Sequence, residues 1–250
     1  MPIQISISNS IKGQASSGGG SSFASTNSFE FDGSTDFIDC GNGASLQITG
    51  ALTISAWVKM SLTADAQTPI LSKDNTTQRC FALWGCIFGV NNPRFIIFNN
   101  NTPTRVNATT NIKDNNWHHI LVSFIPSTSL SIYVDGVQEG INTTSIPSSI
   151  DNDAINFEIG RLSTFYHFEG NIDEVAVWNS DQSAAATTIY NGGVPNDLSS
   201  LSPISWWRMG EAANYAGGTW KLIDQGSGGN NGTSTTLPAP PAQPSTDVPT

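Results

Sequence analysis

Charge is scarce in this sequence, and positive charge is the scarcest of all. Charged residues make up 12% of the 250 residues, and ten Lys and Arg stand against twenty Asp and Glu, for a net charge of −10. No cluster of Lys or Arg occurs. Nucleic-acid binding needs a basic stripe that neutralises phosphates, and adsorption to an anionic membrane needs a basic surface. We therefore expect neither nucleic acid nor a membrane as a partner.

Cysteine is nearly absent: only Cys40, Cys80 and Cys86 occur. No CxxC pair is present, so the sequence does not indicate a zinc site. Cys80 and Cys86 flank a strand-like apolar run, which leaves two alternatives open. Either one disulfide forms and a third thiol stays free, or all three thiols are free and buried.

Long apolar segments are also missing. No stretch could span a bilayer, and the start from Met1 to Ser8 has neither the basic residues nor the continuous apolar run of a secretory leader. We therefore expect the chain to reach a surface without a leader. Assembly into a virion inside an infected cell, followed by lysis, would achieve this.

The sequence is rich in turn residues between short alternating segments. Leu52, Ile54 and Val58 alternate with polar residues, and Asp135-Gly136 is typical of a hairpin turn. The pattern predicts an all-β protein, a two-sheet antiparallel jelly-roll sandwich with one short helix. We expect the helix at 183–190 and strands at 29–32, 52–59, 69–73, 80–90, 94–98, near 106, and at 117–125, 130–134, 155–159, 172–178 and 204–209.

Composition divides the chain into three parts. Residues 1–22 are predicted to form an arm, because Ile3, Ile5 and Ile7 alternate with polar residues and a Gly/Ser-rich linker follows. Residues 23–236 are expected to form the sandwich, including a return strand near 204–209. Residues 237–250 are rich in Pro, Ser and Thr and are predicted to be a disordered or extended tail.

Five motifs, in this order, resemble the laminin-G-like family of concanavalin A-like sandwiches. The resemblance covers roughly residues 29–193 and implies the same two-sheet fold. The motifs are Phe31-Asp32-Gly33-Ser34, Leu52-Thr53-Ile54-Ser55-Ala56-Trp57-Val58-Lys59, Trp117-His118-His119-Ile120, Tyr133-Val134-Asp135-Gly136 and Gly170-Asn171-Ile172-Asp173-Glu174-Val175-Ala176-Val177-Trp178.

The C-terminal part departs from the family pattern. The segments 205–211 and 224–233 resemble the opening strand of many members, yet here they come last. They are either the stub of a second repeat or a return strand that completes this sandwich. We favour the return strand, because an orphan strand carrying Trp206 and Trp207 would leave a large apolar surface exposed.

The sequence does not indicate catalysis. Glycoside hydrolysis needs two carboxylates that flank one bond, and sandwich glucanases carry an E-x-D-x-x-E motif on one strand. The nearest match begins at Glu30, and Thr35 replaces its last acid. His118 and His119 are adjacent on a predicted strand and so point to opposite faces, which prevents a shared site. We expect no enzyme activity.

Two kinds of binding site are candidates. The resemblance implies a structural Ca²⁺ where an early strand meets the last one, with Asp32 and Asp173 as metal ligands; the alternative is that Asp173 caps a turn. Sugar stacking needs an exposed aromatic ring. Trp84 and Trp220 are the freer tryptophans, whereas Trp57, Trp117 and Trp178 stand in family core motifs. The sequence assigns no residue to glycan binding.

The leading functional prediction is a non-catalytic virion structural protein of a bacteriophage, such as a decoration, fibre or tail-associated subunit. The missing leader, the N-terminal arm, the low charge and the Pro-rich tail favour it, and the whole chain resembles the short laminin-G-like proteins of marine phage particles. Its partners would be other virion proteins and sister chains in a homo-oligomer, and it could bind host-surface glycans. The alternative is an exported glycan-binding adhesin or carbohydrate-binding module at the cell surface or outside the cell. A third interpretation is a truncated repeat of a larger surface protein.

Overall fold

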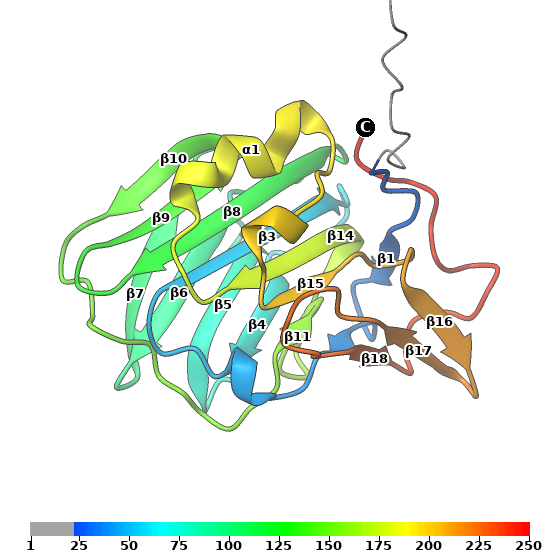
Figure 1. Ribbon diagram of the computed structural model, residues 1–250, viewed down its shortest axis with the longest axis horizontal. Coiled ribbons are helices and arrows are strands. Elements are labelled where there is room, and N and C mark those ends of the chain that lie inside the picture. Colours follow the sequence, from blue (N-terminus) through cyan, green and yellow to red (C-terminus); the bar gives the residue numbers. More distant parts are fainter. Residues whose placement is uncertain (1–22) are drawn as a thin grey trace, which may run out of the picture.

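In the computed structural model, which describes residues 23–250, most strands belong to two antiparallel sheets that pack face to face (Figure 1). The seven-stranded sheet has the order β1-β14-β3-β8-β9-β10, and β15 also pairs with β14. Its strands are β1 (Phe29–Asp32), β3 (Leu52–Met60), β8 (Trp117–Ile125), β9 (Ser129–Val134), β10 (Val137–Asn142), β14 (Glu169–Trp178) and β15 (Ser205–Trp207).

The nine-stranded sheet has the order β16-β17-β18-β2-β11-β4-β5-β6-β7, and a small hairpin of β12 and β13 stands beside it. Strands distant in sequence are neighbours in both sheets, as expected for a jelly roll. The bounds are β2 (Ile38–Asp39), β4 (Thr68–Asp74), β5 (Arg79–Cys86), β6 (Arg94–Asn99), β7 (Thr102–Asn107), β11 (Glu158–Ile159), β12 (Arg161–Leu162), β13 (Tyr166–His167), β16 (Ala213–Ala216), β17 (Thr219–Leu222) and β18 (Gly232–Ser234).

The core lies between the two sheets and is built by the period-two alternation seen in the sequence. Successive side chains of a strand point to opposite faces, so each apolar set meets the apolar set of the facing sheet. The residues predicted to point inward are all fully buried: Ile54, Val58, Ile120, Val122, Phe157 and Val175. The structure confirms the prediction of a two-sheet antiparallel sandwich with one short helix.

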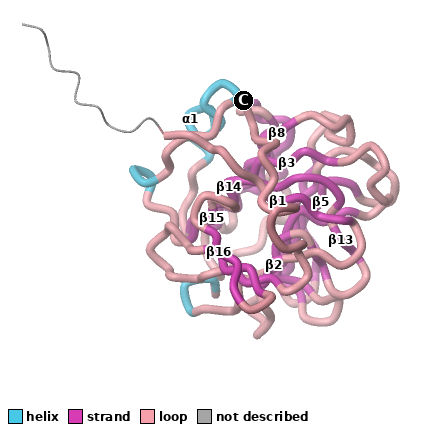
Figure 2. Tube along the Cα trace, turned by 90° about the vertical axis from the view of Figure 1, so that its right-hand side faces the viewer, coloured by secondary structure: helices cyan, strands magenta, loops and turns pink. Residues whose placement is uncertain are grey.

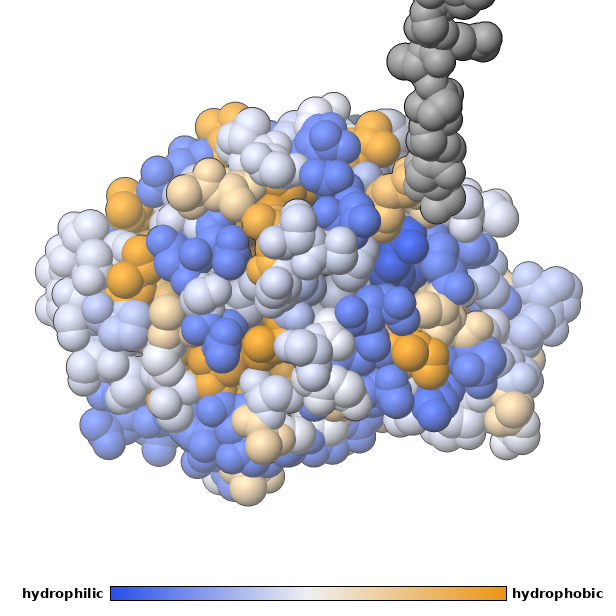
Figure 3. All heavy atoms as spheres, viewed as in Figure 1, coloured by the Kyte–Doolittle hydropathy of each residue, from blue (hydrophilic) through white to orange (hydrophobic). Residues whose placement is uncertain are grey.

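That helix, α1 (Ala186–Tyr190), covers the outer face of the seven-stranded sheet and follows a 3₁₀ turn, Ser183–Ala185. Ala186 and Ile189 pack against Trp178 there, and Figure 1 shows α1 lying across β8. Apolar atoms on this face gather in small separate patches (Figure 3). No helix of residues 23–250 is long and apolar enough to cross a membrane. Further 3₁₀ turns are Ala44–Leu46, Asn191–Gly193 and Ser199–Leu201.

The segment after the helix returns to the sandwich of its own chain. β15 pairs with β14 from Val175 to Val177, while β1 pairs with β14 from Glu169 to Ile172 on the same edge. β1 and β15 therefore lie end to end beside β14. The following hairpin, β16 and β17, joins the nine-stranded sheet through β18, which pairs with β2. The C-terminal part thus contributes to both sheets.

Residues 237–250, which the sequence predicts to be a disordered or extended tail, form no helix or named strand but pack against the sandwich. They run along the outer edge of β1, where Ser245 and Ser28 exchange two backbone hydrogen bonds of 2.9 Å. Gln243 bonds both backbone groups of Glu30 at 3.2 and 2.8 Å. β1 would otherwise present an unpaired strand edge, and covering that edge is the physical reason for the packing. The predicted N-terminal arm, residues 1–22, lies outside the described residues.

Candidate functional site

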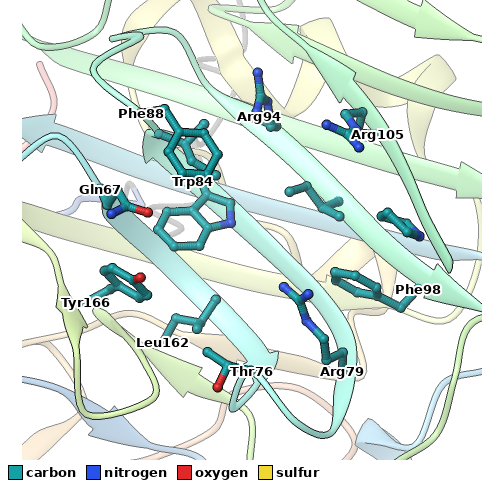
Figure 4. A pocket seen from close by; sticks show the side chains of 13 residues that line it. Gln67, Thr76, Arg79, Trp84, Phe88, Arg94, Phe98, Arg105, Leu162 and Tyr166 are labelled. Carbon is teal, nitrogen blue, oxygen red and sulfur yellow. The ribbon is translucent and has the colours of Figure 1, made fainter. Parts of the chain in front are cut away.

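A groove of about 340 Å³ lies on the outer face of the nine-stranded sheet. Its lining side chains come from β5, β6 and β7 and from neighbouring turns, and the β12–β13 hairpin closes one side (Figure 4). Alternation along the strands creates this second apolar face. Phe95 and Ile97 of β6 point into the core, whereas Ile96 and Phe98 point outward into the groove. Figure 2 shows β13, on the groove side, and α1 on opposite sides of the molecule.

Aromatic side chains form the floor of the groove. Trp84 of β5 lies at the bottom with 5% of its surface exposed, and Tyr166 packs edge-on against it with ring centroids 5.5 Å apart. Within residues 23–250 the indole N–H of Trp84 has no acceptor, whereas those of Trp178 and Trp207 donate to backbone carbonyls at 3.0 and 2.7 Å. The Trp84 indole therefore offers both a ring face and a donor to a ligand.

Phe88 forms one lip of the groove and is 75% exposed. It stands at the tip of a turn in which Ile87 and Val90 exchange two backbone hydrogen bonds of 3.1 Å. Phe88 and Gly89 both have positive φ, at 54° and 74°, as in a type I′ turn. Such turns favour Asn and Gly, and a bulky residue in this conformation costs about 1–2 kcal/mol. An exposed, strained phenylalanine is a candidate contact residue.

Three arginines, Arg79, Arg94 and Arg105, line the groove. Arg79 is held by Asp74 at 3.0 Å and lies over the Phe98 ring, 4.0 Å from the centroid. Arg94 donates from Nε to the side chain of Asn107 at 2.5 Å. Burial, followed by repulsion from Arg105, lowers the pKa of Arg94, although a guanidinium stays protonated in proteins.

The groove lacks acidic side chains. No Asp or Glu is among its lining residues, so the pair of carboxylates that glycosidases need is missing there. Its polar groups are guanidinium and amide donors and a few hydroxyls, set around aromatic rings. This combination of an apolar floor and a few convergent polar groups is typical of a ligand site.

A second candidate site is a buried acidic cluster at the β14–β15 edge, formed by Asp173, Glu174 and Glu211. Carboxylate oxygens of the three lie within 4.8 Å of one another. A β-bulge brings the first two together. Asp173 pairs with Trp57 and Ala176 with Ser55, which leaves one extra residue on β14. Glu174 adopts a positive φ of 47° there, and the bulge breaks the alternation that would send the two carboxylates to opposite faces.

Only part of the negative charge of this cluster is compensated. Arg208 donates to Glu174 at 3.0 Å, and the Ser25 hydroxyl donates to Asp173 at 2.6 Å. One oxygen of Glu211 accepts from the backbone of Asn27 at 3.1 Å, whereas its Oε2 is buried without a partner in the described part of the chain. Burial, then the charge of Glu174, raises the pKa of Asp173 well above its usual range. Burial raises the pKa of Glu174 to about 7, and Arg208 limits that rise.

The structure does not bring Asp32 and Asp173 together, which corrects the predicted pair. Asp32 is opposite Glu169 on β14, and Asp173 lies four residues farther along, roughly 13 Å away at about 3.3 Å per residue. The Asp32 carboxylate instead accepts backbone N–H groups of Ser34 and Thr35 at 2.9 and 2.8 Å, closing a turn. Burial opposes ionisation of Asp32, but these hydrogen bonds outweigh it and lower its pKa.

The other residues singled out in the sequence have structural roles. His119 is buried and its Nε2 is 2.8 Å from the Ser55 hydroxyl, whereas His118 contacts Asp135 at 2.8 Å on the other face. The two imidazoles therefore share no site. Trp220 belongs to the core and donates to the backbone of Pro238. The three thiols, of Cys40, Cys80 and Cys86, are free and buried.

Residues 32–186, more than half of the chain, match the family model described as the concanavalin A-like lectin/glucanases superfamily. A sequence search of curated proteins gives no significant match. Among solved structures, a candidate carbohydrate-binding protein from Bacteroides ovatus aligns with a TM-score of 0.65 and 17% identity, covering 84% of this chain and 58% of that one. The LG4-5 domains of mouse laminin α1 align with a TM-score of 0.50 and 12% identity, covering 63% and 44%.

A native heptameric SAP-like pentraxin from Limulus polyphemus aligns with a TM-score of 0.51 and 13% identity, covering 66% of this chain and 82% of that one. At such identities these alignments show a shared fold. The chain spans little more than half of the Bacteroides protein and less than half of the laminin fragment.

Proposed function

Because the chain belongs to the concanavalin A-like lectin/glucanases superfamily, we propose that it is a non-catalytic carbohydrate-binding module that holds a glycan in the groove over β5 to β7. Sugar rings have apolar C–H faces and polar hydroxyl edges. They are bound by flat aromatic rings together with hydrogen-bonding groups at the rim, and the groove offers both.

The observation that supports the proposal is that Trp84 and Phe88 line the same groove. The first is a sheltered ring with an unused indole donor, and the second is an exposed ring held in a strained turn. A core residue would not need either feature. The volume of about 340 Å³ falls within the range of roughly 300–1,000 Å³ common for ligand pockets. The Bacteroides structure, described as a candidate carbohydrate-binding protein, supports the same assignment.

A glycan array with the full chain tests this proposal. Phe88→Ala removes the exposed ring and should abolish or strongly weaken binding to every glycan that the wild type retains. Leu62→Ala is the matched control, because Leu62 is also an exposed apolar residue (65%) but does not line the groove. Equal binding by Phe88→Ala and the wild type would place the glycan site elsewhere.

We also propose that the acidic cluster holds a structural Ca²⁺. The residues fit this ion, because Ca²⁺ takes carboxylate oxygens and the buried Oε2 of Glu211 has no partner among residues 23–250. Asp173, Glu174 and Glu211 would be its protein ligands. When bound, the ion would neutralise three clustered carboxylates and fix β14 to the segment that follows β15.

The setting in which the module meets its glycan is a separate proposal. A bacteriophage virion, with residues 1–22 attaching the module to sister chains or other virion proteins, remains one setting. The surface of a cell or its surroundings is the other, and the carbohydrate-binding assignment supports it more directly. Gene neighbourhood separates the two settings. Capsid or tail genes beside this gene favour the virion. Surface-polysaccharide genes beside it, without capsid or tail genes, favour the cell surface.

A further inference from the structure

Positive charge is concentrated in the groove although the chain is acidic overall. Three of the five arginines of the chain line the groove, while the net charge of the protein is −10. None of the lining residues is Asp or Glu. A surface that is negative elsewhere and positive in one depression attracts anions to that depression.

Arg94 and Arg105 are unusual among these arginines because they lack an acidic partner. Arg79, Arg161 and Arg208 pair with Asp74, Glu158 and Glu174, respectively. Among residues 23–250, no carboxylate lies within ion-pair distance of Arg94 or Arg105. The chain has twice as many acidic as basic residues, so a shortage of carboxylates does not explain why these two arginines are unpaired.

The register of β6 and β7 forces these two charges together. Arg94 is opposite Asn107, and Arg105 is opposite Ile96, so the two arginines are diagonal neighbours on the outer face. Such neighbours are separated by about 7–8 Å, and like charges at this range repel. Figure 4 shows Arg94 and Arg105 along one side of the groove, with Arg94 between Phe88 and Arg105. A bound anion would offset the repulsion between the two arginines and accept hydrogen bonds from both guanidinium groups.

We propose that the groove selects an acidic glycan, whose anionic substituent lies against Arg94 and Arg105 while a sugar ring lies over Trp84 and Phe88. This inference rests on the proposed function, since it names the class of sugar that the same groove takes. Guanidinium groups form two parallel hydrogen bonds to carboxylate or sulfate oxygens, so both substituents fit the pair.

Calorimetric titration of the full chain with matched oligosaccharides provides the test. The carboxylate probe is an oligogalacturonate, compared with its methyl ester, which keeps the sugar backbone but carries no charge. The sulfate probe is a sulfated galactan oligosaccharide, compared with the unsulfated one. We expect at least one acidic probe to bind about tenfold or more tightly than its neutral counterpart, with affinity falling as salt rises. The pair that shows the preference identifies the anion.

Variants assign that preference to the arginines. Arg94→Gln with Arg105→Gln should remove the preference and its salt dependence. Lys221→Gln is the control, because it removes one exposed positive charge on β17 outside the groove. If the double variant does not fold, Arg105→Gln alone replaces it in the titration, because Arg105 is exposed and its substitution should leave the fold intact.

The outcomes separate this inference from the proposed function. If neutral probes bind as well as acidic ones and the arginine variants change nothing, while Phe88→Ala still abolishes binding, the groove is a glycan site but the acidic selectivity is refuted. If neither acidic nor neutral glycans bind, on the array or in titration, the proposed function fails and this inference fails with it.

Discussion

Trp207 of β15 stacks on Phe157 of the facing layer, with ring centroids 5.5 Å apart and the ring planes inclined by 27°. This contact joins the C-terminal return strand to the opposite side of the core. Trp207 is fully buried, and its indole N–H donates to the backbone of Asn230 at 2.7 Å. The return strand is therefore an integral part of the hydrophobic core.

Truncation after Asp197 should destabilise the whole domain and promote aggregation, because it removes Trp207 and uncovers the edge of β14. Trp207→Ala alone should lower the free energy of unfolding by about 3–5 kcal/mol. Tyr215→Ala, at a partly exposed ring on β16, is the control and should cost much less. Thermal unfolding measures all three. An Asp197 truncation that melts like the full chain would mean that the segment acts as an independent stub.

Truncation after Thr236 should also lower stability, although the sequence alone predicts a nearly neutral effect. The segment that is lost makes five hydrogen bonds to Ser28 and Glu30 at the β1 edge. It also places Asp247 at 2.6 Å from Lys59. A typical hydrogen bond contributes about 1 kcal/mol net, and less where it is exposed to water. We therefore expect the free energy of unfolding, measured with denaturant, to fall by on the order of 2 kcal/mol. An unchanged midpoint would show that this packing contributes nothing.

Calcium should raise the melting temperature, and a chelator should lower it. A ligand that binds only the native state stabilises by RT ln(1 + [L]/Kd), about 2.7 kcal/mol at one hundred times Kd. Asp173→Asn and Glu211→Gln should abolish the response. Asp32→Asn should leave it intact, since Asp32 closes a turn away from the cluster. If neither calcium nor chelator changes the wild-type melting temperature, the cluster binds no calcium, and its carboxyl groups are held by shared protons instead.

Stability should rise with pH between about 4 and 6.5 through His119. Burial lowers the pKa of His119 to about 4 in the folded chain, from the usual 6.5. Between these values the unfolded chain binds a proton that the folded chain does not, so acid favours unfolding. His119→Gln should flatten this part of the curve relative to wild type. The comparison must be made variant against wild type, since Glu174, whose pKa burial raises from 4.5 to about 7, contributes in the opposite sense over much of this range. Parallel curves would show that His119 has no such role.

The fold could be predicted from the sequence because its signals are local. The alternation of Ile54 and Val58 with polar residues, and the turn at Asp135-Gly136, depend only on near neighbours in the chain. The packing of residues 237–250 could not be predicted, because a Pro-rich composition indicates weak local structure and not whether an open strand edge lies nearby.

The sites were less predictable because they depend on register and on irregular backbone. Arg94 and Arg105 become neighbours only through the pairing of β6 with β7. Asp173 and Glu174 share a site only because of a bulge, whereas a regular strand would separate adjacent residues. Phe88 occupies a turn position that favours Asn or Gly, so its role as a lip residue has no turn signal in the sequence.

The most direct test of glycan binding in the groove is a nuclear magnetic resonance titration that follows the indole N–H signals. Only ligands retained by the wild-type chain on the array would be used. We predict that the Trp84 signal shifts and saturates with the glycan, since its indole donor is free within the groove. The signals of Trp178 and Trp220, which donate to Leu201 and Pro238 away from the groove, should stay in place. A saturating shift of either of these signals with an unmoved Trp84 would contradict the account.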